Sequence, residues 1–485
     1  MSTLEGGKEL PEVGDLPVFV TVFYKASPMI WGVGTEGTTR DRILTACGMI
    51  LRNPVFEKSY IVDKEKLVLK IDVMTRRQLV KMKSKGGGAH VEPGVHGMML
   101  QRGDRLFYQL PTDFIALGWE QPGDRARSRK LRMLSVLAEQ AGLGSKGWRN
   151  GNVYRFRTVS FLQEAPDYVP LPLYRGFPSQ KKYSVQDIQD AALQAGRHLL
   201  QNVQPSGRFR YEYDPFTDDA SGFLEYNPTY HATGLYALSV LFQYSKRLEI
   251  IEQTKPPLLW MLRRLEAPLM EPEAAHVAFF GNARTDASAM TLLALTAMPS
   301  KVIEELGVAR VNRLAYYLTL TARDDGRVYP TYFHKLLGFV PERPPFYLEG
   351  LTLLALTRYY QTNKNVEWLL AARKLAAKQI ADFDAGGRAD TWTVQALADM
   401  WRIEKDGRYA EACFRIADAI LKAQFTNDRR PYADYVGGYD VAVPPRVFSA
   451  AIRAEALIAA YRLARTWAER PTVTGTPSCA PPDFF

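Results

Sequence analysis

Hydrophobic and polar positions divide the chain near residue 170 into two stretches with different patterns. In the first, short runs of β-branched and aromatic residues alternate with segments whose apolar residues recur at helical spacing. The runs are typical of half-buried strands, and the spaced segments of helices that bury one face. The pattern predicts strands over Val18–Tyr24, 66–73 and 153–159, a strand pair around Gly103 within 98–108, and helices over Thr39–Leu51 and 130–141. These elements make an α+β domain.

Beyond residue 170 the chain becomes a series of helical segments separated by Gly, Pro and Asp. The segments fall into five tandem pairs, and an Ala-Leu step recurs in every second member. The five alanines of these steps are Ala237, Ala294, Ala355, Ala396 and Ala456. A repeat of about 40 to 60 residues is typical of helical hairpins that stack or close into a ring.

The two members of each pair differ in polarity. The first members carry Arg, Lys and Glu on one face, whereas the second members are small and apolar on nearly every side. We therefore expect the second members to form an inner ring and the first members an outer ring. The first members are expected over 186–200, 257–265, 301–321, 366–383 and 408–425. The second members are expected to begin near Pro228, Thr285, Pro345, Asp390 and Arg446.

Motifs in the first stretch follow one another in a characteristic order. They are Met29-Ile-Trp-Gly-Val-Gly-Thr35, Arg52-Asn-Pro-Val-Phe56, Pro93-Gly-Val-His-Gly-Met-Met-Leu100 and Ala141-Gly-Leu-Gly-Ser-Lys-Gly-Trp148. With the strands between them, they resemble the AMMECR family of small α/β domains across roughly residues 17 to 162. The family's Leu-Arg-Gly-Cys-Ile-Gly signature, laid on residues 29–34, keeps only the last Gly and an apolar residue before it. The resemblance implies a fold and a cytoplasmic location, but no chemistry for that Cys.

The tandem helices resemble the six-hairpin toroids of carbohydrate enzymes, which include glycoside hydrolases, polysaccharide lyases and uronate epimerases. Five of the six hairpins are visible in the sequence. We expect a multidomain α+β and all-α protein, an AMMECR-like α+β domain followed by an α/α toroid of helical hairpins. The expected boundaries are 1–165 for the first domain, 166–180 for a Pro-rich linker, 181–470 for the toroid and 471–485 for a Pro-rich tail.

Composition narrows the classes of protein. The chain has 485 residues, 46% of them hydrophobic, and 62 Lys plus Arg against 52 Asp plus Glu, which is typical of a globular protein with a mildly basic surface. Three cysteines show no metal-ligand spacing, so we expect no structural zinc and no cofactor. No apolar run of membrane-spanning length and no secretory signal occur, so we expect a cytoplasmic protein without a membrane partner.

Titratable residues open several of the second members at one shared position. Six residues before the repeated alanines stand His231, Ser288, Glu349, Asp390 and Ala450. Equivalent positions on parallel helices would project at one end of a ring, where such toroids have their cleft. With Asp286, which lies two residues before Ser288, we predict His231, Glu349 and Asp390 as catalytic residues.

Each of these residues also has a structural explanation. Asp286 and Asp390 stand at helix starts, where carboxylates cap the helix or interact with its dipole. His231 could be a hydrogen-bonded core residue. Glu349 is harder to explain in this way, because it lies inside a helix between apolar neighbours and needs a partner or a cavity.

Aromatic and basic residues near the same helix starts predict a surface on which sugar rings could stack and anionic groups could bind. The predicted substrate-binding residues are Tyr211, Tyr213, Tyr230, Arg284, Tyr347, Arg388, Trp392, Tyr439 and Arg446. The expected partner is a carbohydrate or another small polar substrate.

The sequence leaves the activity open. Two carboxylates could act as general acid and base in glycoside hydrolysis, or His231 and Tyr213 could move a proton in a lyase or epimerase. A non-catalytic scaffold with an aromatic groove is the rival interpretation. Basic clusters at 81–85 and 125–132 leave nucleic-acid binding as a weaker hypothesis, since aromatic residues are not interleaved. A protein partner of the first domain also stays open.

Overall fold

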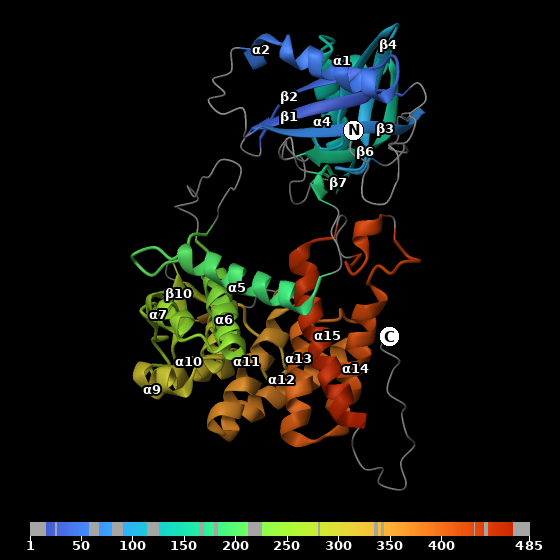
Figure 1. Ribbon diagram of the computed structural model, residues 1–485. Coiled ribbons are helices and arrows are strands. Elements are labelled where there is room, and N and C mark those ends of the chain that lie inside the picture. Colours follow the sequence, from blue (N-terminus) through green and yellow to red (C-terminus); the bar gives the residue numbers. More distant parts are fainter. Residues whose placement is uncertain are drawn as a thin grey trace. The chain divides into compact units, whose positions relative to one another are not determined.

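The computed structural model divides the chain into two compact units, Met1–Tyr183 and Ser184–Phe485, which are described separately (Figure 1). The structure describes residues 16–24, 27–57, 67–79, 91–113, 126–163, 169–178, 183–211, 226–279, 282–333, 338–340, 344–430, 432–440 and 445–468. The predicted tail and the basic cluster at 81–85 lie outside these residues, as does Arg125 of the second basic cluster.

The first unit is built on one antiparallel sheet. Its strands lie in the order β2-β1-β3-β6-β4-β5, and β7 and β8 extend it beside β6. The bounds are β1 (Val18–Tyr24), β2 (Ser27–Gly34), β3 (Leu67–Leu79), β4 (Gly97–Arg102), β5 (Arg105–Gln109), β6 (Asn152–Gln163), β7 (Leu171–Tyr174) and β8 (Phe177–Pro178). Strands β7 and β8 therefore fall within the stretch for which the sequence predicts a linker.

Two helices of the first unit pack on this sheet. Helix α1 (Thr39–Leu51) begins with a capping box between Thr38 and Asp41, and buries Ala46 and Ile50 against β1. It lies so close to β2 that a Cβ on Gly32 would stand 2.2 Å from the Ala46 carbonyl oxygen. Helix α4 (Ala126–Gln140) packs on β4 and β5. Short helical turns α2 (Pro54–Glu57) and η2 (Gly147–Asn150) complete the described part of this unit.

The second unit consists of helical hairpins. The inner members are α6 (Pro228–Ser245), α8 (Thr285–Thr296), α11 (Leu348–Asn363), α13 (Thr391–Glu404) and α15 (Val447–Ala468). The outer members are α5 (Val185–Gln201), α7 (Leu248–Leu262), α9 (Ser300–Leu306) with α10 (Val308–Thr321), α12 (Val366–Asp384) and α14 (Gly407–Lys422). The five predicted pairs are confirmed, and all five predicted starts of the second members lie within three residues of the observed helices. Two first members differ from the prediction, because the helix expected over 257–265 begins at Leu248 and the helix expected over 301–321 is divided at Gly307.

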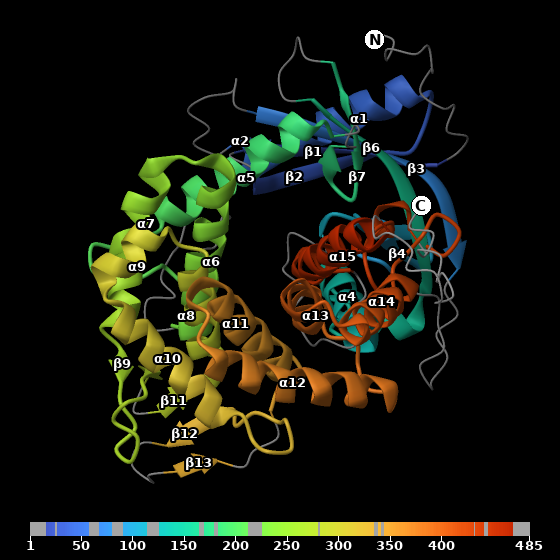
Figure 2. The same cartoon turned by 90° about the horizontal axis from the view of Figure 1, so that it is seen from below.

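The inner helices pack in sequence order, α6 on α8, α8 on α11, α11 on α13 and α13 on α15, with the outer helices around them (Figure 2). One apolar core runs through all five hairpins. In α8 every residue from Thr285 to Leu295 is buried, as expected for a helix surrounded by others. No helix in the described part of the chain is long and apolar enough to cross a membrane.

Equivalent turns end three of the inner helices. Lys246, Lys364 and Lys405 have left-handed backbone conformations, with φ of 57° or 58°, at the ends of α6, α11 and α13. Each backbone N–H donates to the carbonyl oxygen four residues earlier and so ends the helix. The inner helices of these three hairpins therefore end in the same way.

Small strands connect the second and third hairpins. They form an antiparallel sheet in the order β13-β12-β11-β10-β9, in which β11 and β12 come from different hairpins. The bounds are β9 (Leu265–Glu266), β10 (His276–Phe279), β11 (Asn282–Arg284), β12 (Thr331–Phe333) and β13 (Gly338–Val340). Strand β11 leads directly into α8, which fixes the position of Arg284 at the start of that helix.

Candidate active site

A cleft of about 1610 Å³ opens in the second unit. Its walls come from α5 and α6 on one side and from α14 and α15 on the other, and the N-terminal ends of α11 and α13 also line it. The first and fifth hairpins thus face each other across the cleft.

Aromatic side chains line the mouth of this cleft. Tyr230, Phe346, Tyr347 and Trp392 are among its lining residues, and Tyr211 stacks on Tyr230 with ring centroids 5.9 Å apart. Tyr230 and Phe346 are 61% and 55% exposed, so each ring keeps one face open to a ligand while Tyr211 or Arg388 covers the other. Three predicted substrate-binding tyrosines and the predicted tryptophan therefore gather at one place.

Two predicted arginines belong to the same region. Arg388 lines the cleft, and its guanidinium lies 5.7 Å from the centroid of the Phe346 ring. Arg284 stands beside Tyr347 and the carboxylate of Asp286. A ligand in the mouth would therefore meet both aromatic faces and positive charge.

Asp390 is the buried carboxylate of the cleft. It is the N-cap of α13, and its Oδ2 accepts hydrogen bonds from the backbone N–H and the hydroxyl of Thr393, at 2.9 and 2.7 Å. Among the described residues, no hydrogen-bond donor reaches its buried Oδ1 with good geometry. Burial raises the pKa of Asp390 to about 6, against the opposing effect of its hydrogen bonds with Thr393. An N-cap residue does not need to be buried this completely, so its capping role alone does not explain the burial of Asp390.

Asp286 and Arg284 are not among the residues that line the cleft, and the Asp286 carboxylate is held differently from that of Asp390. Its two oxygens accept hydrogen bonds from Arg284, at 3.1 and 2.8 Å, and Oδ1 accepts another from the backbone N–H of Ala287. The Tyr347 hydroxyl stands 3.4 Å from Oδ2. Asp286 is therefore an ion-paired carboxylate with three hydrogen bonds from a guanidinium and an amide.

The two aspartates flank the start of α11. Tyr347, which precedes this helix, contacts Asp286 of α8. On another side Gly350 faces Asp390, because a Cβ on Gly350 would stand 1.8 Å from Oδ2. Two carboxylates in contrasting surroundings thus lie on either side of one helix terminus.

Glu349 does not line the cleft. It is buried, and burial raises its pKa to about 7, with smaller contributions from the carboxylates of Asp390 and Asp382. Arg327 acts on it in the opposite direction. Asp382 belongs to outer helix α12 and Arg327 to the loop after α10, so Glu349 faces the outer layer. The expectation that it converges with Asp390 in one cavity is not met.

His231 lies away from the cleft as well. Its ring stacks on Trp260 with centroids 4.9 Å apart, and Phe209 and Tyr226 pack on its other sides. Nε2 is 3.0 Å from the carbonyl oxygen of Pro257 in outer helix α7. Burial lowers the pKa of His231 to about 4. The shared position six residues before each alanine therefore turns toward the outer layer in α6 and α11.

The remaining predicted residues are scattered. Tyr439 is buried beneath Arg453, whose guanidinium is 5.1 Å from its ring centroid, and does not line the cleft. Arg446 is exposed just before α15, outside the cleft lining. Tyr213 lies outside the described residues.

The sequence interpretation missed a polar network deeper in the ring. Arg358 of α11 donates to the Tyr236 hydroxyl at 2.7 Å, to Gln395 Oε1 at 3.2 Å and to Asp399 Oδ2 at 3.1 Å. The Tyr236 hydroxyl is also 3.2 Å from Glu455 Oε1. Tyr236 and Glu455 line the cleft.

The repeated alanines could have identified this network. Tyr236, Gln395 and Glu455 each stand one residue before an alanine of the repeat. Arg358 and Asp399 stand three residues after one. These two positions differ by four residues and share a helix face. The helix face that carries this network could therefore have been identified from the polar residues that interrupt the apolar pattern.

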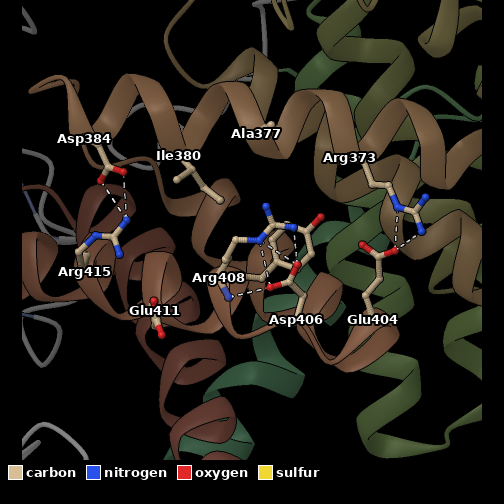
Figure 3. A pocket seen from close by; sticks show the side chains of 10 residues that line it. Arg373, Ala377, Ile380, Asp384, Glu404, Asp406, Arg408, Glu411 and Arg415 are labelled. Carbon is tan, nitrogen blue, oxygen red and sulfur yellow. Dashed lines mark hydrogen bonds and ion pairs between the residues drawn. The ribbon is translucent and has the colours of Figure 1, made fainter. Parts of the chain in front are cut away.

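A second hollow, of about 860 Å³, lies between outer helices α12 and α14 (Figure 3). All of its charged residues except Glu411 are joined in ion pairs. The pairs are Arg373 with Glu404, Arg408 with Asp406 and Arg415 with Asp384. In the described residues no group of three or more His, Cys, Asp or Glu side chains is placed to hold a metal ion.

No family model and no curated protein matches the chain. Solved structures resemble parts of it at low identity. An uncharacterised protein from Pyrococcus horikoshii is 18% identical over 36% of this chain and 86% of its own, with a TM-score of 0.29. A glycoside hydrolase family 76 α-mannanase from Bacteroides thetaiotaomicron is 15% identical over 50% and 71%, with a TM-score of 0.40. A D-mannose isomerase is 14% identical over 60% and 84%, with a TM-score of 0.44. The AMMECR-like and toroid assignments stay predictions.

Proposed function

We propose that the second unit is a carbohydrate-active enzyme, a glycoside hydrolase that takes an oligosaccharide or glycoconjugate into the cleft. Asp390 is the general acid, and Asp286 is the ionised carboxylate that acts as general base or nucleophile. The observation that carries this proposal is the contrast between the two carboxylates, one buried with no cation partner among the described residues and one paired with Arg284. Glycosidases need such a contrast, because one carboxyl must hold a proton while the other is charged.

The chemistry follows from these two states. Asp390 gives its proton to the glycosidic oxygen as the bond to the anomeric carbon breaks. In direct attack by water, Asp286 takes one water proton while the hydroxyl bonds to that carbon. Return of this proton to Asp390 through solvent completes the addition of one water molecule. The distance between the two carboxylates decides whether a water molecule or Asp286 itself attacks the anomeric carbon first.

Aromatic and basic groups at the mouth support this substrate class. The rings of Tyr230, Tyr347 and Trp392 offer apolar faces to the C–H faces of sugar rings. The guanidinium of Arg388 would bind a negatively charged substituent of a sugar beside these rings. Proton abstraction by His231, as in a lyase or epimerase, lacks this support because His231 is buried against α7.

The test is a screen of the purified full chain against aryl glycosides and linear glycans, followed by substitution of the two aspartates. Asp390→Asn keeps an N-cap residue and removes the transferable proton, so we expect kcat to fall about 10²–10⁴-fold. Asp286→Asn should have an effect of similar size.

Glu349→Gln is the matched control, because Glu349 is also a buried acid at the start of an inner helix but faces the outer layer. It should retain activity close to that of the unaltered chain. Binding of glycans without turnover would favour the scaffold interpretation instead. Equal losses in the Glu349 and Asp390 variants would contradict the assignment of Asp390.

For the first unit we keep the AMMECR-like assignment and the cytoplasmic location as proposals. The elements β1, α1, β3, β4 with β5, α4 and β6 follow the order on which the resemblance rests, and this order supports the former. Nucleic-acid binding by the basic clusters stays a hypothesis. Affinity that does not fall as salt rises would exclude it.

A further inference from the structure

The cleft continues well beyond the candidate catalytic carboxylates. Its lining residues run along α6 from Thr229 to Tyr244 and along α15 from Phe448 to Arg462. At 1.5 Å per residue, each wall is about 20 Å long. The N-terminal ends of both helices lie at the mouth, so the walls extend from the mouth to the opposite end of the ring. The groove is long enough for several linked sugar units.

The chemistry along this groove alternates between apolar and hydrogen-bonding groups. Small side chains of α5 and α14, such as Ala192, Ala195 and Ala419, leave it wide. Tyr236 and Tyr244 present phenol groups, and Tyr244 is 57% exposed. Glu455 and Gln243 add hydrogen-bonding groups between them, and Arg453 and Arg462 of α15 add positive charge to the lining. Apolar faces interrupted by hydrogen-bond acceptors fit a chain of sugar rings with their hydroxyls.

Glu455 is preorganised for this purpose. Arg358 donates to the Tyr236 oxygen, so the phenol proton is left to point at Glu455 Oε1. Within the described residues, the Tyr236 hydroxyl is the group that donates a hydrogen bond to Glu455. An ionised carboxylate accepts about four hydrogen bonds, which leaves room for two neighbouring hydroxyl donors of a sugar ring. The Arg358 network fixes the position of Tyr236 and Glu455 from behind.

We propose that this arm of the cleft, from Tyr236 and Glu455 to Gln243 and Tyr244, is an extended subsite for a linear glycan. The enzyme would then cut within chains, because the open side of the ring admits a strand that continues past the carboxylates. This inference rests on the proposed function of the same cleft.

The experiment compares substrates of different length. A ladder of linear oligosaccharides, made from the glycan found in the screen, is offered to the full chain, and kcat/KM is measured for each length. We expect kcat/KM to rise with length until the groove is filled. We also expect long polymers to yield internal fragments early rather than single sugars.

Tyr244→Ala should lower the ratio of kcat/KM for long over short substrates about tenfold, because an aromatic contact at a binding site is lost. Glu455→Gln should lower the same ratio while keeping the size of the side chain. Tyr461→Ala is the matched control. Tyr461 is also a partly exposed tyrosine, 43% exposed on α15, but it does not line the cleft.

The outcomes separate the two proposals. If no glycan is cleaved, the proposed function fails and this inference fails with it. If glycans are cleaved without dependence on length, or only from chain ends, the function stands and the extended subsite is excluded. Equal effects of Tyr244→Ala and Tyr461→Ala would also exclude it.

Discussion

The cleft and the hollow between α12 and α14 both gather arginines and carboxylates, but they arrange them in opposite ways. In the hollow Asp384, Glu404 and Asp406 each have an arginine partner, so charge is neutralised locally. In the cleft Asp390 is 4% exposed and has no cation partner among the described residues. Exposed ion pairs contribute little to stability, whereas a buried unpaired carboxylate destabilises the fold. The buried carboxylate of Asp390, whose charge no cation among the described residues neutralises, is therefore a better indicator of function than the ion pairs of the hollow.

The largest expected effect comes from placing a methyl group in the cleft floor. Alanine normally stabilises a helix by about 1 kcal/mol relative to glycine. In Gly350→Ala, however, the new Cβ would stand 1.8 Å from Asp390 Oδ2 and 2.6 Å from the Thr393 hydroxyl. We expect the free energy of unfolding to fall by about 3 kcal/mol, because Asp390 must leave its capping position. Urea denaturation measures this change.

Gly407→Ala provides the matched control. Gly407 opens α14 beside the ionic hollow, and a Cβ there would meet its nearest atom, in the Trp467 ring, at 3.5 Å. This substitution should be neutral or slightly stabilising. Equal destabilisation by the two substitutions would contradict the contrast between the two regions.

The next effect concerns the pH dependence of stability. Because burial raises the pKa of Asp390 above the ordinary value of 3.8, the folded state binds its proton more tightly than the unfolded state. The contribution of Asp390 to stability is therefore fully present below pH 3.8 and is lost as pH rises through about 6. The amide that Asp390→Asn introduces does not titrate. Relative to the unaltered chain, this variant should gain on the order of 2 kcal/mol above neutral pH and little at about pH 4.

This prediction is checked by unfolding both proteins across the same pH range. Glu349, whose pKa burial raises to about 7, is present in both proteins, so most of its own contribution cancels. A gain that is the same at all pH values would mean that packing, and not ionisation, distinguishes the two side chains. A variant that loses activity while gaining stability above neutral pH would mark Asp390 as a residue kept for function.

The smallest effect is expected in the ionic hollow. Arg408→Ala removes the partner of Asp406, but the Arg408 side chain is 83% exposed. The free energy of unfolding should change by less than about 1 kcal/mol, and the change should shrink as salt is added. A larger loss that is insensitive to salt would show that the hollow behaves like a buried site.

Much of the fold could be predicted from the sequence, because helical periodicity and the alanine repeat are local signals. The helix Thr39–Leu51 and the strand Val18–Tyr24 are confirmed to the residue. Strand β2 was not predicted, since Pro28 and two glycines interrupt the pattern of Ser27–Gly34. The pairing of β11 with β12 depends on loops of different hairpins and has no local signal.

The site was less predictable for a related reason. A repeat along a helix gives the spacing of equivalent residues, but not the face that turns inward. Inner helices such as α8 and α11 are buried on nearly all sides, so hydrophobicity does not distinguish their faces. Hence Glu349 and Asp390 share a position in the repeat, yet only Asp390 lines the cleft. Polar residues inside the apolar runs, Arg358 and Asp399, would have indicated the face correctly.

The hydrogen bond between Tyr236 and Glu455 also has a consequence for folding. Most contacts of the hairpins join neighbours in the chain, which can form in succession as each hairpin docks on the last. This bond joins residues that are 219 positions apart. Closing so long a loop has an entropic cost that local contacts do not share, so we expect the bond to form late in refolding. Its formation would then report the moment at which the two ends of the array meet.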